Sequence, residues 1–383
     1  MSDFIPGGCS TYSKQQNRFP ANYPPYLMAG NGCVVRGSDS RTYLDLISGL
    51  GAIFLGYQHP AVDQAVLRQL RAGTLFSLRN PIEGEVAQQF CEMTGWDQVR
   101  WGKNGSDATE AAVRLARSVT GRDMILTMGG YHGYHSDLVT SQPGKEGGIL
   151  DRCKHSLMEW NGDYTSLRGL APQCAALIVE PITYEPIPIW EEIKASLVGT
   201  GCLLIFDEVI TGFRYAAGGA AAYLDVRPDL ACYGKALGNG MPIAAIAGDC
   251  NLMCEFEERV FFSGTYGAEC LSLAAAGAVM KVLAHDADLY GRLWEAGSLL
   301  QKGFNDRAQT HGVDAQCVGL PPRTQFRFRY PAQREQFCAA MVEQGVLVGR
   351  DNFLTVAHTV SIVEKILTAC AMALDKIAEK GKS

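Results

Sequence analysis

An acidic pair stands at the end of an apolar run, a favourable place for a functional carboxylate. Cys202–Phe206 is wholly apolar, as a buried strand would be, and Asp207 and Glu208 follow it directly. In open α/β sheets, ligands bind beyond the carboxyl ends of the strands. Side chains alternate along a strand, so Asp207 and Val209 share one face and Glu208 points to the other. Asp207 is thus placed to meet a cationic ring nitrogen, with Val209 packed beneath the ring, although an acid that merely begins a turn gives the same pattern.

A lysine among glycines gives a second signal. Lys235 lies in the segment YGKALGNGMP, which contains no other charged residue. Partial removal from water favours the neutral amine, which is the form that attacks an aldehyde. The competing interpretation is a solvated surface lysine before a glycine-rich turn.

A glycine turn opens a helical pattern further upstream. Asn104, Gly105 and Ser106 precede the helix-period stretch Thr109–Ser118. Free amides at a helix N-terminus, together with a serine hydroxyl and the helix dipole, form a ready phosphate site. An ordinary N-cap uses the same residue types, so this motif alone leaves both interpretations open.

Two further strand ends carry polar or aromatic residues. Tyr131 and His132 follow the predicted strand Met124–Thr127, and Glu180 follows Ala175–Val179. An aromatic ring at such a position can stack on a flat cofactor, and a histidine can assist proton transfer. Core packing and loop hydrogen bonding are the alternatives for these three residues.

Over nearly its whole length the sequence resembles the class III aminotransferases of fold type I, and within them the glutamate-1-semialdehyde aminomutase-like branch. The hallmarks are FDEVITGFR at Phe206–Arg214 and the later Gly-Lys before a glycine-rich turn. The resemblance implies pyridoxal 5'-phosphate (PLP) held as a Schiff base on Lys235, with Asp207 at the pyridine nitrogen. It also implies ring contacts from Val209 and Tyr131, phosphate contacts from Asn104, Gly105 and Ser106, and supporting roles for Glu180, His132 and Glu208.

The resemblance extends to Ser263–Gly267, a segment whose threonine, here Thr265, reaches the cofactor phosphate of the neighbouring subunit in the family. A homodimer with shared active sites is therefore expected. Gly267-Ala268-Glu269 stands where the family more commonly has Gly-Gly-Asn, and Asn104 takes the place of a serine.

The function implied is that of a PLP-dependent aminotransferase or aminomutase acting on a small amino-acid-like or amine substrate. A PLP-dependent decarboxylase is the alternative, and the intact Lys235, Asp207 and Ser106 argue against a non-catalytic family member. Arg18 and Arg350 are candidates for the substrate carboxylate by region only. The segments Ser141–His155 and Arg350–Thr355 are shorter than in typical relatives, which predicts an open cleft that admits a bulky or polymer-linked amine.

Alternation of helix-period and apolar strand segments predicts an α/β fold with a mostly parallel sheet in a large domain. We expect a smaller α+β domain built from N- and C-terminal segments, with boundaries at 1–55, 56–290 and 291–383. In Arg323–Tyr330, arginines alternate with aromatic residues, which predicts a strand with a solvated arginine face.

Composition narrows the function classes. The 383 residues carry a net charge of −6, which disfavours nucleic acid, and no apolar run is long enough to predict a membrane span. The 13 cysteines are scattered without zinc-ligand spacing, so we expect reduced thiols, no metal site and a cytoplasmic enzyme.

Overall fold

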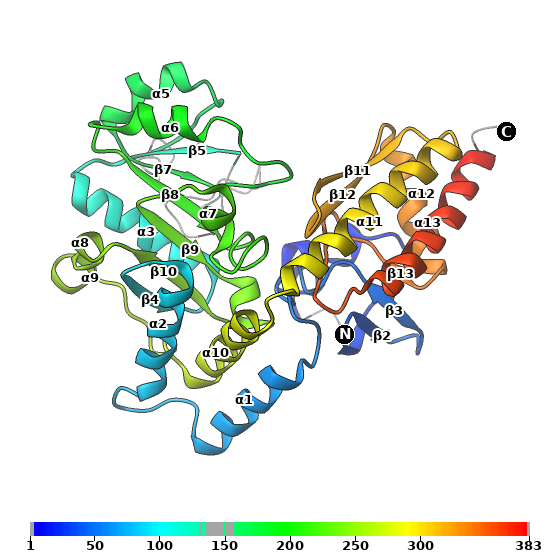
Figure 1. The fold of residues 1–383 in the computed structure, drawn as a ribbon, viewed down its shortest axis with the longest axis horizontal. Coiled ribbons are helices and arrows are strands. Elements are labelled where there is room, and N and C mark those ends of the chain that lie inside the picture. Colours follow the sequence, from blue (N-terminus) through cyan, green and yellow to red (C-terminus); the bar gives the residue numbers. More distant parts are fainter. Residues whose placement is uncertain are drawn as a thin grey trace. The chain divides into compact units, whose positions relative to one another are not determined.

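The computed structural model describes residues 4–129, 132–134, 147, 149, 153 and 156–380. Its contacts divide the chain into a large unit, Pro60–Ala287, and a small unit made of Met1–His59 and Asp288–Ser383. Each unit has its own sheet structure and its own helices (Figure 1). Tyr131 and most of Ser141–His155 lie outside the described residues.

Among the described residues, the large unit contains a seven-stranded sheet in the order β4-β10-β9-β8-β7-β5-β6. The strands are β4 (Gln98–Gly102), β5 (Met124–Met128), β6 (Leu157–Glu159), β7 (Cys174–Val179), β8 (Leu203–Glu208), β9 (Leu230–Tyr233) and β10 (Ala244–Gly248). Strands β9, β8, β7, β5 and β6 pair in parallel, whereas β10 is antiparallel to both of its neighbours. The predicted mostly parallel sheet is confirmed, with the segment near Ile243–Ala247 as its antiparallel member.

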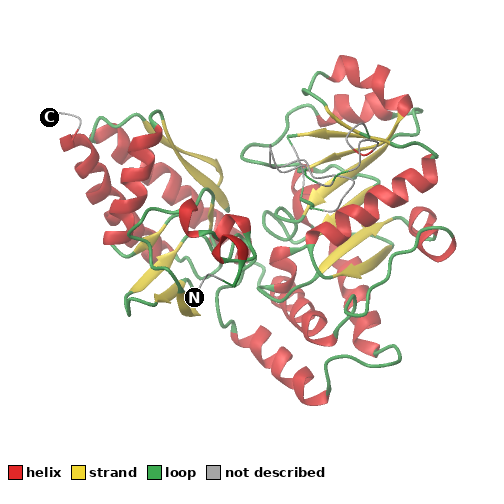
Figure 2. Cartoon of the chain, turned by 180° about the vertical axis from the view of Figure 1, so that it is seen from behind, coloured by secondary structure: helices red, strands yellow, loops and turns green. Residues whose placement is uncertain are grey.

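Helices lie on both sides of this sheet (Figure 2). The helices of the large unit are α1 (Pro60–Ala72), α2 (Pro81–Thr94), α3 (Gly105–Thr120), α5 (Tyr164–Leu170), α6 (Trp190–Leu197), α7 (Gly219–Leu224), α8 (Cys250–Met253), α9 (Glu255–Glu258) and α10 (Cys270–His285), as far as the described residues go. Helix α3 packs on the sheet through alanines such as Ala108 and Ala112, which meet Ile205 and Ile246 in one buried cluster. Small side chains let the helix approach the strands closely, so its N-terminus is fixed relative to the strand ends.

The limits of α3 follow from its sequence. Asn104 accepts a hydrogen bond from the Asp107 amide, and the Asp107 carboxylate accepts one from the Asn104 amide, which completes a capping box. At the other end Gly121 adopts φ +65°, the left-handed conformation that commonly ends a helix. The start of this helix is therefore determined locally.

The small unit joins segments that are far apart in sequence. Its first sheet contains β1 (Leu27–Asn31), β2 (Val34–Gly37), β3 (Thr42–Asp45) and β13 (Val346–Leu347), and its second contains β11 (Ala315–Leu320), β12 (Arg323–Phe328) and β14 (Asn352–Phe353). The pairing of β3 with β13 builds one sheet from both ends of the chain. Helices α11 (Leu289–Thr310), α12 (Pro331–Glu343) and α13 (Val360–Lys380) complete a unit of α+β type, as predicted.

The prediction of a solvated arginine face on β12 is wrong at its first position. Arg323 is only 4% exposed, and its guanidinium lies 3.4 Å from the carboxylate of Asp351. Arg327 further along the strand is exposed. Pairing with an acid from the β13–β14 connection explains why the first arginine is buried, because a buried charge requires a partner.

Within the described residues, no single helix is both long and apolar enough to cross a membrane; α10 and α11 meet the length and composition criteria only when taken together across a bend.

Candidate active site

Asp207 is a fully buried carboxylate near the carboxyl end of β8. Its Oδ1 accepts a hydrogen bond from the Val209 amide at 3.0 Å. Its Oδ2 accepts two hydrogen bonds from His132, one from the main-chain amide and one from Nδ1 at 2.9 Å. Burial raises the pKa of Asp207, but the charge and hydrogen bonds of His132 and the Val209 amide outweigh it and leave the pKa below its usual value. The site therefore contains a sheltered anion.

Lys235 begins the short 3-10 helix Lys235–Gly238, directly after β9 and Gly234. Its side chain is half-buried, and Nζ lies 3.2 Å from Nε2 of His132. Its backbone has φ +39°, a left-handed conformation that costs a non-glycine residue on the order of 1 kcal/mol. Backbone strain of this kind clusters at functional sites, where the surrounding structure enforces it.

Val209 brings three segments of the large unit together. A Cβ added to Gly105 would lie 2.8 Å from both Cγ1 and Cγ2 of Val209, and one added to Gly234 would lie 3.4 Å from Cγ1. The valine thus packs directly on the N-terminus of α3 and on the residue before Lys235. Because Val209 follows Asp207 by two positions, the acid, the lysine and this helix terminus belong to one site.

The predicted phosphate loop, Asn104-Gly105-Ser106, forms the start of α3. Ser106 is 6% exposed, and its hydroxyl forms no hydrogen bond with another described residue. The Asn104 side chain is already engaged by Asp107. Thr109, one turn into the helix, donates to the His132 carbonyl at 2.8 Å. The helix therefore offers amides and a hydroxyl to an anion and also fixes the histidine.

Other predicted residues have separate surroundings. Glu208 accepts hydrogen bonds from the Thr211 hydroxyl and from the amides of Ala220 and Ala221 in the first turn of α7, and burial raises its pKa to about 7. Glu180 is half-buried directly after β7. Glu208 is therefore held by Thr211 and by the start of α7.

Three of the remaining candidates are exposed. Thr265 is exposed in the segment before α10. Arg18 and Arg350 are exposed residues of the small unit, and the guanidinium of Arg18 stacks 3.8 Å above the Tyr12 ring. Tyr131 lies outside the described residues, so its predicted ring contact stays a prediction.

One polar pair next to the predicted phosphate loop is not apparent from the sequence. Lys103 Nζ lies 2.8 Å from Oε1 of Glu269. Glu269 is the one sign of this pair in the sequence, because it stands where the family that the sequence resembles more commonly has asparagine. Its partner could not be inferred because the two residues are 166 positions apart.

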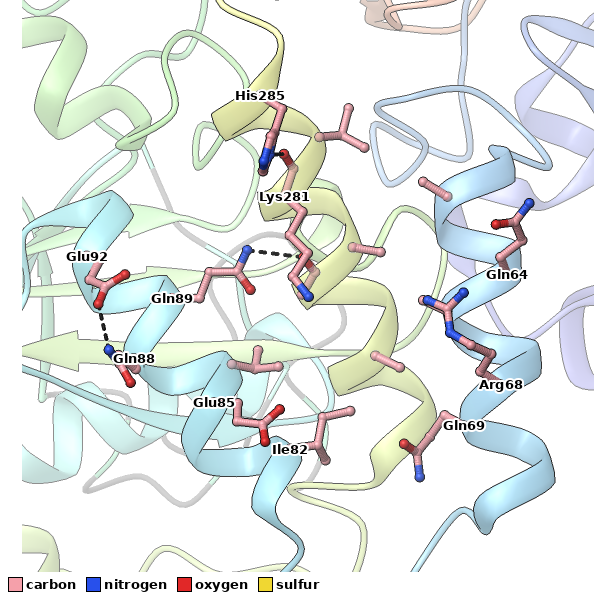
Figure 3. Close-up of a pocket in the computed structure, with 17 residues that line it drawn as sticks. Gln64, Arg68, Gln69, Ile82, Glu85, Gln88, Gln89, Glu92, Lys281 and His285 are labelled. Atoms are coloured by element: carbon pink, nitrogen blue, oxygen red, sulfur yellow. Dashed lines mark hydrogen bonds between the residues drawn. The ribbon is translucent and has the colours of Figure 1, made fainter.

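A pocket of about 790 Å³ lies elsewhere in the large unit, between α1, α2 and α10 (Figure 3). Arg68 of α1, Glu85 of α2 and Lys281 of α10 are among its lining residues, which also include several alanines and Gly277. None of the predicted site residues lines it.

Comparison with known proteins decides the family, because the profile described as aminotransferase class-III matches residues 17–378. The chain belongs to the class III aminotransferases. It is 30% identical to a glutamate-1-semialdehyde 2,1-aminomutase from Thermomicrobium roseum, over 98% of this chain and 96% of the relative. A second such aminomutase, from Methanothermobacter thermautotrophicus, is also 30% identical, over 97% and 96%.

Solved structures agree with this assignment. An omega-transaminase from Sphaerobacter thermophilus is 26% identical with a TM-score of 0.88, covering 98% of this chain and 95% of its own. The PLP-bound FumI protein of Sphingopyxis sp. MTA144 is 26% identical with a TM-score of 0.92, covering 99% and 95%. The predicted family and fold type I architecture are confirmed. The class III chain is a PLP-dependent enzyme of the aminotransferase and aminomutase type.

The described residues fit PLP. A buried ionised carboxylate suits a protonated pyridine nitrogen, and Asp207 is such a group. A strained, half-buried lysine lies on the far side of His132 from it. The N-terminus of α3, packed on Val209, offers amide donors that suit a phosphate.

Proposed function

We propose that Lys235 is the catalytic residue of this class III enzyme and binds the cofactor aldehyde. Support comes from the connected set of Asp207, His132 and Lys235, joined at 2.9 and 3.2 Å. In this proposal Asp207 holds a proton at the pyridine nitrogen and Val209 packs against the ring. The amides of Gly105 and Ser106, with the Ser106 hydroxyl, bind the phosphate, while the His132 side chain orients Asp207.

Bound PLP supplies an electron sink for the bond broken next to the substrate nitrogen. The amine of Lys235 would be the base that removes the proton from the substrate α-carbon and delivers it to a different atom. Asp207 stays ionised and keeps the pyridine nitrogen protonated. The burial of Asp207 excludes water from this contact, which strengthens it.

The proposed reaction is transfer of an amino group, between two molecules or between adjacent carbons of one molecule, on a small amino-acid-like substrate. The likeness to named aminomutases and to an omega-transaminase supports both outcomes. A panel of amino acids and amines, assayed for keto product, positional isomer and CO₂, separates transfer, 1,2-shift and decarboxylation. Release of CO₂ as the main product would overturn this part of the proposal.

The role of Lys235 has a direct test. Borohydride treatment of the PLP-loaded protein should fix the cofactor covalently to the Lys235 peptide, as read by peptide mass. Lys235→Ala should prevent that labelling and reduce turnover by roughly 10³-fold or more, as removal of a covalent catalytic group does. Labelling of a different lysine would contradict the assignment.

We further propose a homodimer in which Thr265 serves the neighbouring site. Exposed apolar side chains support a covered surface around this segment: Leu75, Phe76, Leu78, Phe261 and Tyr266 are 42–84% exposed. The two loops that carry them adjoin, since the Cys270 amide donates to the Thr74 carbonyl at 2.9 Å. Exposed apolar side chains on adjoining loops are typical of a protein interface.

Subunit complementation tests the shared site. A hybrid of Thr265→Ala and Lys235→Ala subunits contains one site with both residues intact only if Thr265 acts across the interface. Mixed dimers should therefore recover activity that neither homodimer has. Activity of the hybrid that stays at the level of the separate variants, or a monomer by ultracentrifugation, would contradict the proposal.

A cytoplasmic location is also proposed. All 13 cysteines are free thiols, which is typical of proteins kept in a reducing compartment. Detection of the protein in the cytosolic fraction of its source cells, without disulfides by mass analysis, is the expected result.

A further inference from the structure

The Lys103–Glu269 pair lies directly beside the phosphate loop. Lys103 immediately precedes Asn104-Gly105-Ser106, and its Nζ lies 2.8 Å from Glu269 Oε1 and 3.1 Å from Ser272 Oγ. The lysine side chain is 23% exposed and the glutamate 14%. Water and salt screen such a sheltered pair less than a surface pair, so loss of one partner leaves a poorly solvated charge.

Both partners are also tied to a helix N-terminus. Glu269 caps α10 by accepting from the amides of Leu271 at 2.8 Å and Ser272 at 3.0 Å. On the other side, the Asp107 carboxylate of α3 accepts from the Lys103 amide at 2.7 Å. A continuous series of polar contacts therefore joins the starts of α3 and α10.

The two segments also approach each other at neighbouring positions. Arg100 donates to the Phe262 carbonyl at 2.9 Å. A Cβ added to Gly267 would lie 3.3 Å from the Trp101 carbonyl oxygen, closer than most such contacts. The ion pair is thus one of several links between the phosphate loop and the segment before α10.

We propose that Lys103 and Glu269 are positioning residues, which together hold the phosphate loop in the orientation that binds the cofactor phosphate. This inference rests on the proposed role of Gly105 and Ser106. Because the pair is neutral as a whole, it acts through geometry and adds no net charge to the site. The phosphate then depends on neutral amides, the Ser106 hydroxyl and the α3 dipole.

A positioning role and a purely electrostatic role predict different effects of the two substitutions on phosphate binding. If only charge mattered, removing the lysine cation would weaken phosphate binding, and removing the glutamate anion would strengthen it. If the pair positions the loop, Lys103→Met and Glu269→Gln both weaken it. Lys103→Met is the cleaner variant because it leaves the cap of α10 intact.

The test measures binding of PLP and of pyridoxal, which has no phosphate, to the cofactor-depleted chain by equilibrium dialysis. Lys103→Met and Glu269→Gln should each weaken PLP binding roughly tenfold, in line with the loss of a supporting contact, and change pyridoxal binding less than about twofold. Lys103→Arg should bind PLP nearly as tightly as wild type. Lys302→Met, which removes a lysine from the exposed pair with Asp306, is the matched control.

Each outcome has a defined meaning. Opposite effects of the two variants on PLP, equal losses for PLP and pyridoxal, or unchanged PLP binding would each overturn the positioning role. Thermal unfolding of the cofactor-depleted variants is measured in parallel to show that they fold. If Lys103→Met does not fold, Lys103→Arg provides the test. The inference is rejected if Lys103→Arg binds PLP as weakly as Glu269→Gln does. A wild type that binds no PLP rejects the proposed function instead.

Discussion

The Asp207 carboxylate and His132 are joined by two hydrogen bonds to one oxygen, from the histidine main-chain amide and from Nδ1 at 2.9 Å. Asp207 is fully buried, and His132 is the main source of the interactions that offset the cost of burying its charge. The other ring nitrogen lies 3.2 Å from Lys235 Nζ. The histidine therefore contacts both groups proposed to act on the cofactor.

His132→Gln should raise the pKa of Asp207, because the charge and the side-chain hydrogen bond of the histidine would no longer offset the burial of the carboxylate. The acid limb of the pH–rate profile should move to higher pH, and kcat/KM should fall roughly 10- to 100-fold, as for loss of an orienting partner. Steady-state rates across pH measure both effects. His285→Gln, at the end of α10, should leave the profile unchanged; a His132→Gln profile with an unmoved acid limb argues against this role.

Gly105→Ala should weaken PLP binding because its Cβ would lie 2.8 Å from both methyl carbons of Val209. We expect such overpacking to lower the free energy of unfolding by roughly 1–3 kcal/mol and to weaken PLP binding. The double variant Gly105→Ala/Val209→Ala removes the clash and should recover much of the stability, as thermal unfolding would show.

A control for the glycine change is Gly84→Ala in α2. No atom lies within 4 Å of a Cβ added there, so the substitution should stabilise the helix by roughly 0.5–1 kcal/mol. Equal destabilisation by Gly105→Ala with and without Val209→Ala would show that the valine contact is not the cause.

Much of the large-unit architecture could be predicted from periodicity. Apolar runs predict β5, β7 and β8, and helical spacing predicts α1 and α3. Helix α10 gives no such pattern because 11 of its 16 residues are buried, including every position from Ser272 to Met280. The antiparallel direction of β10 is likewise set by its pairing with β4 and β9, which the local sequence does not encode.

The candidate site likewise contains residues that the sequence reveals locally and contacts that only the folded chain reveals. Asp207 and Lys235 stand out locally, one at a strand end and one between glycines. The contact of Val209 with Gly105 and the pair Lys103–Glu269 join residues more than a hundred positions apart and depend on how α3 packs on the sheet. Tertiary packing, which a single sequence does not display, fixes these contacts.

Glu208 should make the large unit less stable as pH rises. Burial raises its pKa to about 7 from an ordinary value of 4.5, so the folded state retains a proton that the unfolded state loses. The stabilisation is complete below about pH 4.5 and is lost as pH rises through about 7, a change on the order of 3 kcal/mol.

Glu208→Gln removes this titration. The melting temperature of the variant relative to wild type should therefore increase between pH 5 and pH 8, a range that brackets most of the titration. Glu257→Gln, at an exposed position on α9, should show no such trend. A difference between Glu208→Gln and wild type that is constant across pH would contradict the buried titration.

His358 should make the small unit less stable as pH falls. It is fully buried, its Nδ1 accepts from the Thr355 amide at 3.0 Å, and burial lowers its pKa from 6.5 to about 4. The unfolded chain binds a proton first as pH falls, so this stabilisation is complete above about pH 6.5 and is lost as pH falls through about 4. His358→Asn should flatten the acid-induced loss of stability, whereas His285→Gln should not.

Glu208 and His358 therefore give contributions of opposite sign in the window from about pH 4.5 to 6.5, where each changes proton binding on unfolding by about one. If both units unfold together, the two contributions largely cancel in wild type. Each single variant then reveals the contribution of the residue that remains. The stability of Glu208→Gln should fall more than that of wild type as pH decreases, and the stability of His358→Asn should fall more as pH increases. Thermal unfolding of both variants and the double variant from pH 4.5 to 7 tests this, and parallel shifts of the two single variants would exclude it.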